Sequence, residues 1–433
     1  MRLLLVSAGD FFSSYGGGQI YLKNLVDRLI DAKFELVILS PINVDRSTGS
    51  YRNKRVIYYA PNDDFSCRIL RDIFVDVKPD VVHAHGMKSK MAEFCHELGI
   101  PCLVTAHHGG ILCPAGALLN KNDAICKVKA SHNACLPCVL NNIRWGGYAH
   151  FFLKMFSVHQ RLKLAYYLQQ YPFFPYISPV CTATLTIDEK INEWSRIYRY
   201  SSKLIAPSRA IAESMMLNGA PAEKIAIVSH GSAVPQVVRG KKNDAPEYST
   251  SSLKFFFVGR ISYEKGLHVL LKALSRISGE NLVELHVVGG AETKNEIRYL
   301  LTLRKIYRHD ERIVWHGKKK YADMNKLIEP FDVLVHPAIC LEVYGLTIAE
   351  AHMMQKPVIA TRCGGPEDQI RDGVNGLLVE PNNSEELRKA MEKLIKNRAL
   401  IAIMSERASE GVVTMEEHAQ KLINLYRQCL EQS

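Results

Sequence analysis

The chain lacks several features that would place it in a specialised class. No uninterrupted apolar run reaches the ~18 residues that a membrane-spanning helix needs. The apolar start, residues 1–10, is too short for a signal peptide, lacks a small-residue cleavage pattern and ends in Asp10. No internal repeat is evident at the scale of roughly 20–50 residues. We therefore expect a cytoplasmic protein whose eleven cysteines are mostly reduced.

Acidic residues are scarce relative to basic ones. The 433 residues include 44 Asp and Glu against 55 Lys and Arg, a net charge of +11. This excess favours an anionic partner, which could be nucleic acid, a phosphorylated ligand or an acidic membrane face. No basic run is long enough to form a nucleic-acid-binding arm, so we do not expect nucleic acid. An apolar share of 47% and a charged share of 23% are ordinary for a globular protein and exclude a disordered or collagen-like chain.

Short apolar runs rich in β-formers recur along the chain, and longer helical patterns separate them. Their continuous hydrophobicity is typical of strands that are covered on both faces. Strands that alternate with helices predict an α/β fold with two Rossmann-like, doubly wound parallel-sheet domains. The predicted strands are Leu3–Ser7, Phe34–Leu39, Val56–Ala60, Val81–Ala84, Cys102–Thr105, Leu204–Ala206, Ile225–Ser229, Lys254–Val258, Val283–Val288, Arg312–Trp315, Val333–His336, Pro357–Ala360 and Gly376–Val379.

A polar segment without periodicity separates the two halves and predicts the domain limits. Residues 1–236 form the predicted N-terminal domain, 237–252 the linker, and 253–412 the C-terminal domain. Ligands of such sheets bind beyond the carboxyl ends of the strands, so we expect the site in the cleft between the two domains.

Two glutamates flank a predicted helix start in the second half. A strand ends near His336, Glu342 precedes the helix that begins at Gly345, and Glu350 lies eight residues after Glu342. Eight helical steps span at most about 12 Å, the scale of a nucleotide sugar. The free N–H groups of the helix start, at Gly345 and Leu346, suit a diphosphate. The alternative is a capping glutamate and a surface glutamate.

Two basic residues lie in the loop after the strand that opens the second domain. Arg260 and Lys265 stand five residues apart in the loop after that strand, and such a pair can grip a diphosphate. The alternative is a basic surface loop. Gly364 and Gly365 follow another strand and would let the backbone approach a ligand, unless they form an ordinary turn.

These motifs together resemble the retaining family 4 glycosyltransferases of the GT-B fold (glycosyl transferases group 1). Their order and spacing match over residues 254–380, including Asn375-Gly-Leu-Leu-Val. The first half matches more loosely, and in this family the last helix, here within 413–433, returns to the N-terminal domain. Tyr344 and His230 depart from the family pattern, which usually has Phe and Asn there. The looser matches are Gly16-Gly17-Gly18, Pro79–His85, Thr105–His107, Ala206–Ser208 and His230-Gly231.

The resemblance implies transfer of a sugar from a nucleoside diphosphate to an acceptor hydroxyl, with retention at the anomeric carbon. Arg260 and Lys265 would stabilise the departing diphosphate in place of a divalent metal, so no cofactor is expected for catalysis. The acceptor would be a saccharide or a lipid-linked molecule of surface polysaccharide, lipopolysaccharide or glycolipid synthesis. The implied contacts are Glu342 to the sugar, Glu350 to the ribose, His107 to the sugar or acceptor, and Gly17, Gly18, Gly345 and Leu346 to the nucleotide sugar. Two other classes stay open: a nonhydrolysing sugar-nucleotide epimerase, and a non-catalytic sugar-nucleotide binder.

Four cysteines gather in an insert at residues 113–138. Cys113, Cys126, Cys135 and Cys138 could supply four thiolates to a structural zinc ion. The alternatives are unrelated free cysteines, and an iron–sulfur or redox role.

A second insert, residues 145–180, holds eleven aromatic and three basic residues and no acidic one. Such a composition suits peripheral contact with an anionic membrane, on the inner face of the cytoplasmic membrane. The alternatives are core packing of a helical insert and stacking of nucleic-acid bases on the aromatic rings.

Overall fold

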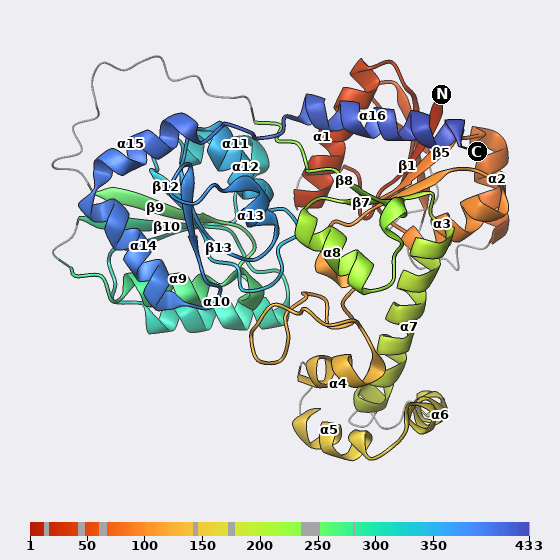
Figure 1. Cartoon of the computed structure of the whole chain (residues 1–433), viewed down its shortest axis with the longest axis horizontal. Coiled ribbons are helices and arrows are strands. Elements are labelled where there is room, and N and C mark those ends of the chain that lie inside the picture. The colour runs from red at the N-terminus through yellow and green to blue at the C-terminus, as the bar shows by residue number, and fades with distance from the viewer. Residues whose placement is uncertain are drawn as a thin grey trace. The chain divides into compact units, whose positions relative to one another are not determined.

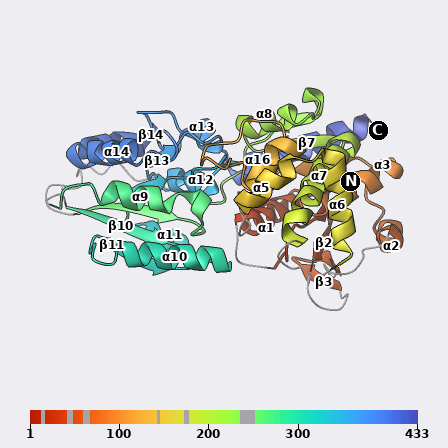
Figure 2. The same cartoon turned by 90° about the horizontal axis from the view of Figure 1, so that it is seen from below.

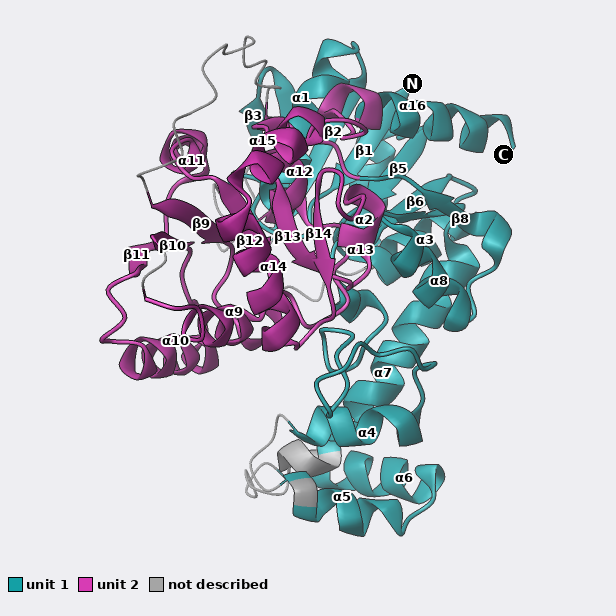
Figure 3. Cartoon of the chain, turned by 60° about the vertical axis from the view of Figure 1, so that its left-hand side comes forward, with its two compact units in different colours: residues 1–13, 18–229, 419–433 teal, residues 14–17, 230–418 magenta. Residues whose placement is uncertain are grey.

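A computed structural model describes residues 1–12, 17–41, 48–59, 67–141, 146–171, 178–234, 252–279 and 282–432. The chain folds into two compact units, coloured separately in Figure 3. Unit 1 comprises residues 1–13, 18–229 and 419–433, and unit 2 comprises 14–17 and 230–418. The predicted linker lies outside the described residues except for Ser252. No helix in the described part of the chain is long and apolar enough to cross a membrane.

Unit 1 is built on an eight-stranded sheet with the order β3-β4-β2-β1-β5-β6-β7-β8. The central strands β5 and β6 are buried along their whole length and β1 is buried from Leu3 onward, as their continuous hydrophobicity predicts. Its strands are β1 (Arg2–Val6), β2 (Glu35–Pro41), β3 (Thr48–Tyr51), β4 (Lys54–Tyr59), β5 (Val81–Ala84), β6 (Cys102–Thr105), β7 (Lys203–Ala206) and β8 (Ile225–Ile227). Its sheet-associated helices are α1 (Gly17–Asp31), α2 (Cys67–Val77), α3 (Lys88–Glu97) and α8 (Arg209–Leu217).

Strand β3 has no counterpart among the predicted strands. It pairs antiparallel with β4, whereas the other strand pairs of this sheet are parallel. Its sequence, Thr-Gly-Ser-Tyr, has no apolar run, because it lies at the sheet edge. The turn to β4 uses Arg52 and Asn53, both with positive φ, as a tight hairpin requires.

A helical insert interrupts unit 1 between β6 and β7. The long helix α7 (Ser178–Tyr200) leads back to the sheet, and α4 (His132–Asn141), α5 (Gly146–Lys154) and α6 (Val158–Gln169) gather near its other end (Figure 1). Leu136 and Leu140 of α4, Leu153 of α5 and Ile187 of α7 share one small apolar core.

Unit 2 contains a six-stranded parallel sheet with the order β11-β10-β9-β12-β13-β14 (Figure 3). Figure 2 shows β10, β11, β13 and β14 of this sheet in a second view. Its strands are β9 (Leu253–Val258), β10 (Val283–Val288), β11 (Ile313–Gly317), β12 (Val333–His336), β13 (Val358–Thr361) and β14 (Gly376–Val379). Its helices are α9 (Leu267–Leu274), α10 (Lys294–Ile306), α11 (Tyr321–Ile328), α12 (Leu346–Met353), α13 (Gly365–Gln369), α14 (Ser384–Lys396) and α15 (Arg398–Arg407).

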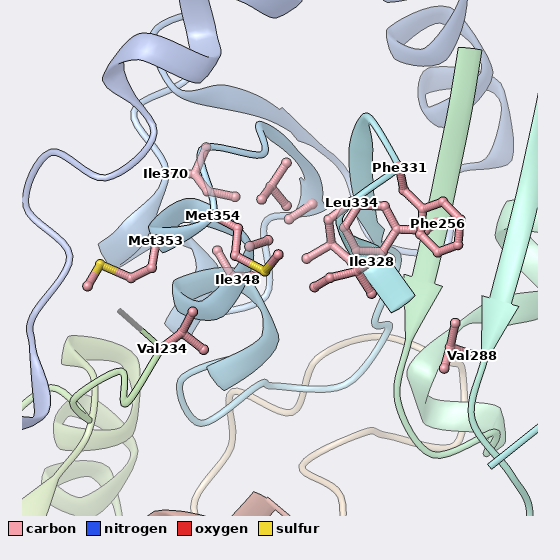
Figure 4. Packing of buried hydrophobic residues seen from close by; sticks show 13 residues of the cluster. Val234, Phe256, Val288, Ile328, Phe331, Leu334, Ile348, Met353, Met354 and Ile370 are labelled. Carbon is pink, nitrogen blue, oxygen red and sulfur yellow. The ribbon is translucent and has the colours of Figure 1, made fainter. Parts of the chain in front are cut away.

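The core of unit 2 packs helices against this sheet. Phe256 and Leu334, from neighbouring strands, lie in one cluster with Phe331, Ile348 and Met354 (Figure 4). Ile348 of α12 is fully buried, so this cluster fixes the helix that follows Glu342.

The last helix, α16 (Met415–Glu431), is divided between the units, and its residues from Ala419 onward group with unit 1. There Tyr426 is fully buried, and its hydroxyl lies 2.7 Å from Nδ1 of His83 on β5. Nε2 of His83 lies 2.7 Å from the Thr105 hydroxyl on β6. The C-terminal helix is thus part of the packing of the first sheet.

Candidate active site

The predicted donor-site residues of unit 2 follow three adjacent strands. Arg260 and Lys265 come after β9, Glu342 after β12, and Gly364 after β13. Because β9, β12 and β13 are neighbours in a parallel sheet, these loops meet at the same edge. The backbone joins them: Ile339 N–H donates to Glu264 O at 2.9 Å, and Glu342 N–H donates to Cys363 O at 2.7 Å.

Two glycines permit this close approach of the loops. Gly266 has φ +70, and a Cβ there would lie 1.8 Å from the carbonyl oxygen of Pro337. A Cβ on Gly365 would lie 2.4–2.6 Å from backbone atoms of Tyr344. Neither site can accept a side chain without backbone movement, so the glycines set the spacing of the site.

An ion pair occupies the centre of these loops. Lys265 Nζ lies 2.5 Å from Glu342 Oε2, and His336 Nε2 lies 3.3 Å from the same oxygen. Only 13% of the Glu342 side chain is exposed. Burial opposes ionisation of Glu342, but Lys265 and His336 overcome it and hold the pKa of this carboxyl well below its usual range. Burial likewise opposes the charge on Lys265, but Glu342 raises the pKa of its ammonium.

Glu350 has the opposite electrostatic character. It lies on α12 and accepts a hydrogen bond at 2.9 Å from the hydroxyl of Tyr321, the first residue of α11. Burial raises the pKa of Glu350 to about 7, and the Tyr321 hydrogen bond opposes this rise only in part. The two glutamates therefore differ in charge near neutral pH, although both lie beside the same helix.

Arg260 forms ion pairs outside the central Lys265–Glu342 pair. Its guanidinium lies 2.8 Å from Glu264 Oε1 and 3.3 Å from Glu296 Oε1, and 52% of its side chain is exposed. The structure thus brings Lys265 and Glu342 into contact, whereas Arg260 and Glu350 contact other side chains. Sequence reasoning missed Glu264, Glu296 and Tyr321. Glu296 carried a usable signal, because it completes a capping box with Thr293 at the start of α10.

Helix α12 begins at Leu346, directly after Gly345. Gly345 caps the helix with φ +88 and offers no side-chain hydrogen bond to it. Leu346, which follows, is the first helical residue and is only partly buried. The Ile348 N–H donates back to the Gly345 carbonyl at 2.9 Å, and N–H groups at the start of a helix suit an anionic group.

The two departures from the family pattern contact each other. The rings of His230 and Tyr344 lie 5.6 Å apart in an edge-to-face arrangement, and His418 lies 5.9 Å from His230 on another side. Burial, with a contribution from His418, holds the pKa of His230 well below its usual range. The pair is therefore a neutral packing contact and adds no charge to the site.

In unit 1, His107 lies just beyond the end of β6 and is partly buried. Its Nε2 is 2.6 Å from Nδ1 of His85, which follows the neighbouring strand β5, and its ring packs on Tyr21 at 5.2 Å. Gly17 and Gly18 begin α1 and are exposed, while Gly16 lies outside the described residues. Ligand contacts by these residues stay predictions.

The four insert cysteines carry free thiols. Cys113 and Cys135 are buried, and Cys126 and Cys138 are partly exposed. Burial, with smaller contributions from the other three cysteines, raises the pKa of the Cys135 thiol to about 11. Within the described ranges, no group of three or more His, Cys, Asp or Glu side chains is arranged to hold a metal ion. The zinc site stays a prediction without geometric support.

Comparison with known proteins defines the class. Residues 239–411, which include Arg260, Lys265, Glu342 and Glu350, match the family model of glycosyl transferases group 1. At the level of class, this part of the chain is similar to group 1 glycosyltransferase domains.

One curated relative is similar over part of this chain. The lipopolysaccharide core biosynthesis glycosyltransferase LpsE of Rhizobium meliloti is 29% identical over 160 residues, which are 36% of this chain and 43% of LpsE. The chain thus matches less than half the length of this curated relative.

Two solved structures are similar over the whole chain. Anabaena HepE in complex with UDP and glucose has a TM-score of 0.67 at 17% identity and covers 99% of both chains. Sucrose-phosphate synthase from Thermosynechococcus elongatus has a TM-score of 0.70 at 17% identity and covers 100% of both. At this identity the likeness establishes the fold, and it confirms the predicted architecture of two parallel-sheet α/β units of the GT-B class.

Proposed function

We propose that the protein is a retaining glycosyltransferase that moves a sugar from a nucleoside diphosphate to an acceptor hydroxyl. The observation that carries this proposal is the Lys265–Glu342 ion pair beside His336, in loops at the ends of adjacent strands, in a part of the chain similar to group 1 glycosyltransferase domains. The fold shared with HepE, whose structure contains UDP and glucose, supports a nucleotide-sugar donor.

Positive charge would drive departure of the leaving group. When the bond from the anomeric carbon to the diphosphate breaks, negative charge grows on the phosphate oxygens. Lys265 and Arg260 would stabilise that charge more in the transition state than in the ground state. Arg260 is half exposed, so its guanidinium can exchange Glu264 and Glu296 for phosphate oxygens. In this proposal no divalent metal takes part.

Glu342 would face the sugar. Its low pKa keeps it ionised, so it can stabilise positive charge that develops at the sugar ring. The acceptor oxygen would form its bond to the anomeric carbon on the face that the diphosphate leaves. The acceptor proton would pass to the departing phosphate oxygen, which gives retention without a separate base.

Glu350 would hold the ribose hydroxyls of the nucleotide. It lies on α12, whose first-turn N–H groups suit the diphosphate. Hydrogen bonds from hydroxyls favour the ionised carboxylate, so nucleotide binding would lower the pKa of Glu350. A surface saccharide or lipid-linked acceptor is part of this proposal, and its support is that one relative is a lipopolysaccharide core biosynthesis glycosyltransferase.

The first test measures donor binding and turnover in the purified chain. A thermal-shift screen of nucleotide sugars identifies the donor, and release of nucleoside diphosphate then reports transfer to candidate acceptors. Arg260→Ala and Glu342→Ala should each reduce turnover at least ~100-fold, because each removes one transition-state stabiliser. The matched control is Arg298→Ala, which removes an exposed arginine from α10 of the same unit and should leave turnover unchanged.

The same assay separates the alternatives. An epimerase would convert the sugar nucleotide with little diphosphate release, and a binder would release none. Near-normal turnover in both Arg260→Ala and Glu342→Ala would reject the mechanism.

A further inference from the structure

Helix α5 has apolar side chains on two opposite sides. Ala149 and Leu153 face inward and pack against α4 and α7. Tyr148, Phe151 and Phe152, followed by Met155 just past the helix, have the spacing of a second stripe. They are 63–74% exposed. Since the inward stripe already anchors the helix, stability of the insert does not explain the outward one.

The neighbouring helix repeats this arrangement. Ala165 of α6 is buried with Leu185 of α7, whereas Tyr166 and Tyr167 are each 58% exposed. Core packing therefore accounts for Leu153 and Ala165 but not for the exposed aromatics. Clusters of exposed large apolar side chains are uncommon on a free protein surface and mark a binding surface. We call Tyr148, Phe151, Phe152 and Met155 the α5 face.

The sequence that contains α5 and α6 is rich in positive charge. From Ala124 to Ile187 the sequence contains no Asp or Glu and six Lys or Arg. Lys154 on α5 and Lys163 on α6 are exposed. Arg161 is excluded from this surface because it is buried and donates to Asn133 at 2.5 Å.

We propose that the α5 face docks the protein onto an anionic lipid bilayer. Phe151, Phe152 and Met155 would enter the boundary between headgroups and acyl chains. Tyr148 suits the headgroup level, where amphipathic rings are enriched. Lys154 and Lys163 would meet anionic headgroups, which attract basic side chains near the surface.

The positive charge near the α5 face also argues against a second copy of this chain as its binding partner. In a symmetric dimer the α5 face would meet itself, and Lys154 and Lys163 of the two copies would repel each other. A bilayer of anionic lipid has the complementary charge. The insert, with α5 and α6, lies near the end of α7 away from the sheet of its own unit (Figures 1 and 3).

The test is vesicle flotation with the full-length chain. Wild-type protein should float with vesicles of phosphatidylglycerol and phosphatidylethanolamine, and at least tenfold more weakly with phosphatidylcholine alone. The triple variant Phe151→Ser/Phe152→Ser/Met155→Ser should bind the anionic vesicles at least tenfold more weakly. The matched control, Leu301→Ser/Ile306→Ser on α10, also removes exposed apolar side chains (60% and 63% exposed) and should bind like wild type.

Further measurements check this result. Unchanged circular dichroism and an unchanged melting temperature would show that the triple variant is folded. If the triple variant is not folded, Lys154→Glu/Lys163→Glu gives a second test and should weaken vesicle binding about tenfold. In the Phe152→Trp variant, brominated acyl chains should quench the fluorescence of the new tryptophan. Absence of wild-type flotation, or equal flotation of wild type and the folded triple variant, overturns the proposal. So does a wild-type dimer that the triple variant converts to monomer. Because donor binding is not part of this assay, failure here is distinct from failure of the proposed transferase activity.

Discussion

At the scale of the residue, the two glutamates beside α12 show how local surroundings assign different chemistry to the same side chain. Glu342 has Lys265 and His336 within ion-pair distance, whereas Glu350 has a tyrosine hydroxyl. Burial alone would raise both pKa values, and only Glu342 has the positive charge that reverses this.

Removing one member of the Lys265–Glu342 ion pair should lower the unfolding free energy more than removing both members. Lys265→Met leaves the Glu342 carboxylate largely buried with only His336 beside it, so we expect a loss of about 3 kcal/mol of unfolding free energy. Lys265→Met/Glu342→Leu should recover at least half of that loss. Urea denaturation measures both. The control is Lys318→Met, which breaks an exposed pair with Glu292 and should cost less than about 1 kcal/mol. Equal losses in the single and double variants would contradict this account.

Glu350 predicts a pH dependence of stability with a defined sign. Its pKa rises from 4.5 to about 7 on folding, so the folded state binds more protons than the unfolded state between these values. Stability from this group is complete below pH 4.5 and is lost as the pH rises through 7. Glu350→Gln keeps an acceptor for Tyr321 and removes this loss, so it should stabilise the protein by about 3 kcal/mol at pH 8 and little at pH 4.

Thermal denaturation at the two pH values measures this difference. Glu311→Gln, at an exposed position, should show none. A Glu350→Gln variant that is no more stable than wild type at pH 8 would mean that the carboxyl is not held in its neutral form.

At the scale of the element, the loops after β9, β12 and β13 meet because their strands are adjacent and parallel. A sequence shows which residues follow each strand but does not show the order of strands in the sheet. The predicted strands of unit 2 were all confirmed, and so their loops were correctly assigned. The contact of Arg260 with Glu296 was missed because Glu296 comes from α10, which follows a different strand.

The close contact between Gly266 and the Pro337 carbonyl predicts that position 266 tolerates no side chain. Gly266→Ala adds a Cβ that would overlap the Pro337 carbonyl and also strains a positive φ, so we expect a loss of at least about 3 kcal/mol and reduced turnover. Gly373→Ala is the matched control, because Gly373 has φ +78 but a Cβ added there would meet no atom within 4 Å. It should cost only about 1–2 kcal/mol, the strain alone. Similar urea midpoints for the two variants would exclude the steric contribution.

At the scale of the whole molecule, the last helix ties the C-terminus to the first sheet. Tyr426→Ala removes a fully buried ring and its hydrogen bond to His83, and should lower the unfolding free energy of unit 1 by about 3–5 kcal/mol. Calorimetry should show the loss in the transition of unit 1. Arg427→Ala, at the adjacent exposed position, should be neutral. An unshifted transition in Tyr426→Ala would show that α16 is dispensable for this unit.

Local pattern alone determined the strands, the alternation with helices and the α/β class, because burial on both faces leaves a continuous apolar run wherever a central strand lies. It also determined the donor-site motifs, since those residues stand at fixed offsets from strand ends. Pattern did not determine β3, whose edge position needs no apolar run.

Three-dimensional packing determined which charges meet. Glu342 and Lys265 are 77 positions apart, and only the adjacency of β9 and β12 brings them to 2.5 Å. Packing also distinguished the two sides of α5, whose sequence is apolar on both: contact with α4 buried one side, and the other remained exposed. The physical reason is common to both cases, because the energy of a charge or an apolar side chain depends on its neighbours in space.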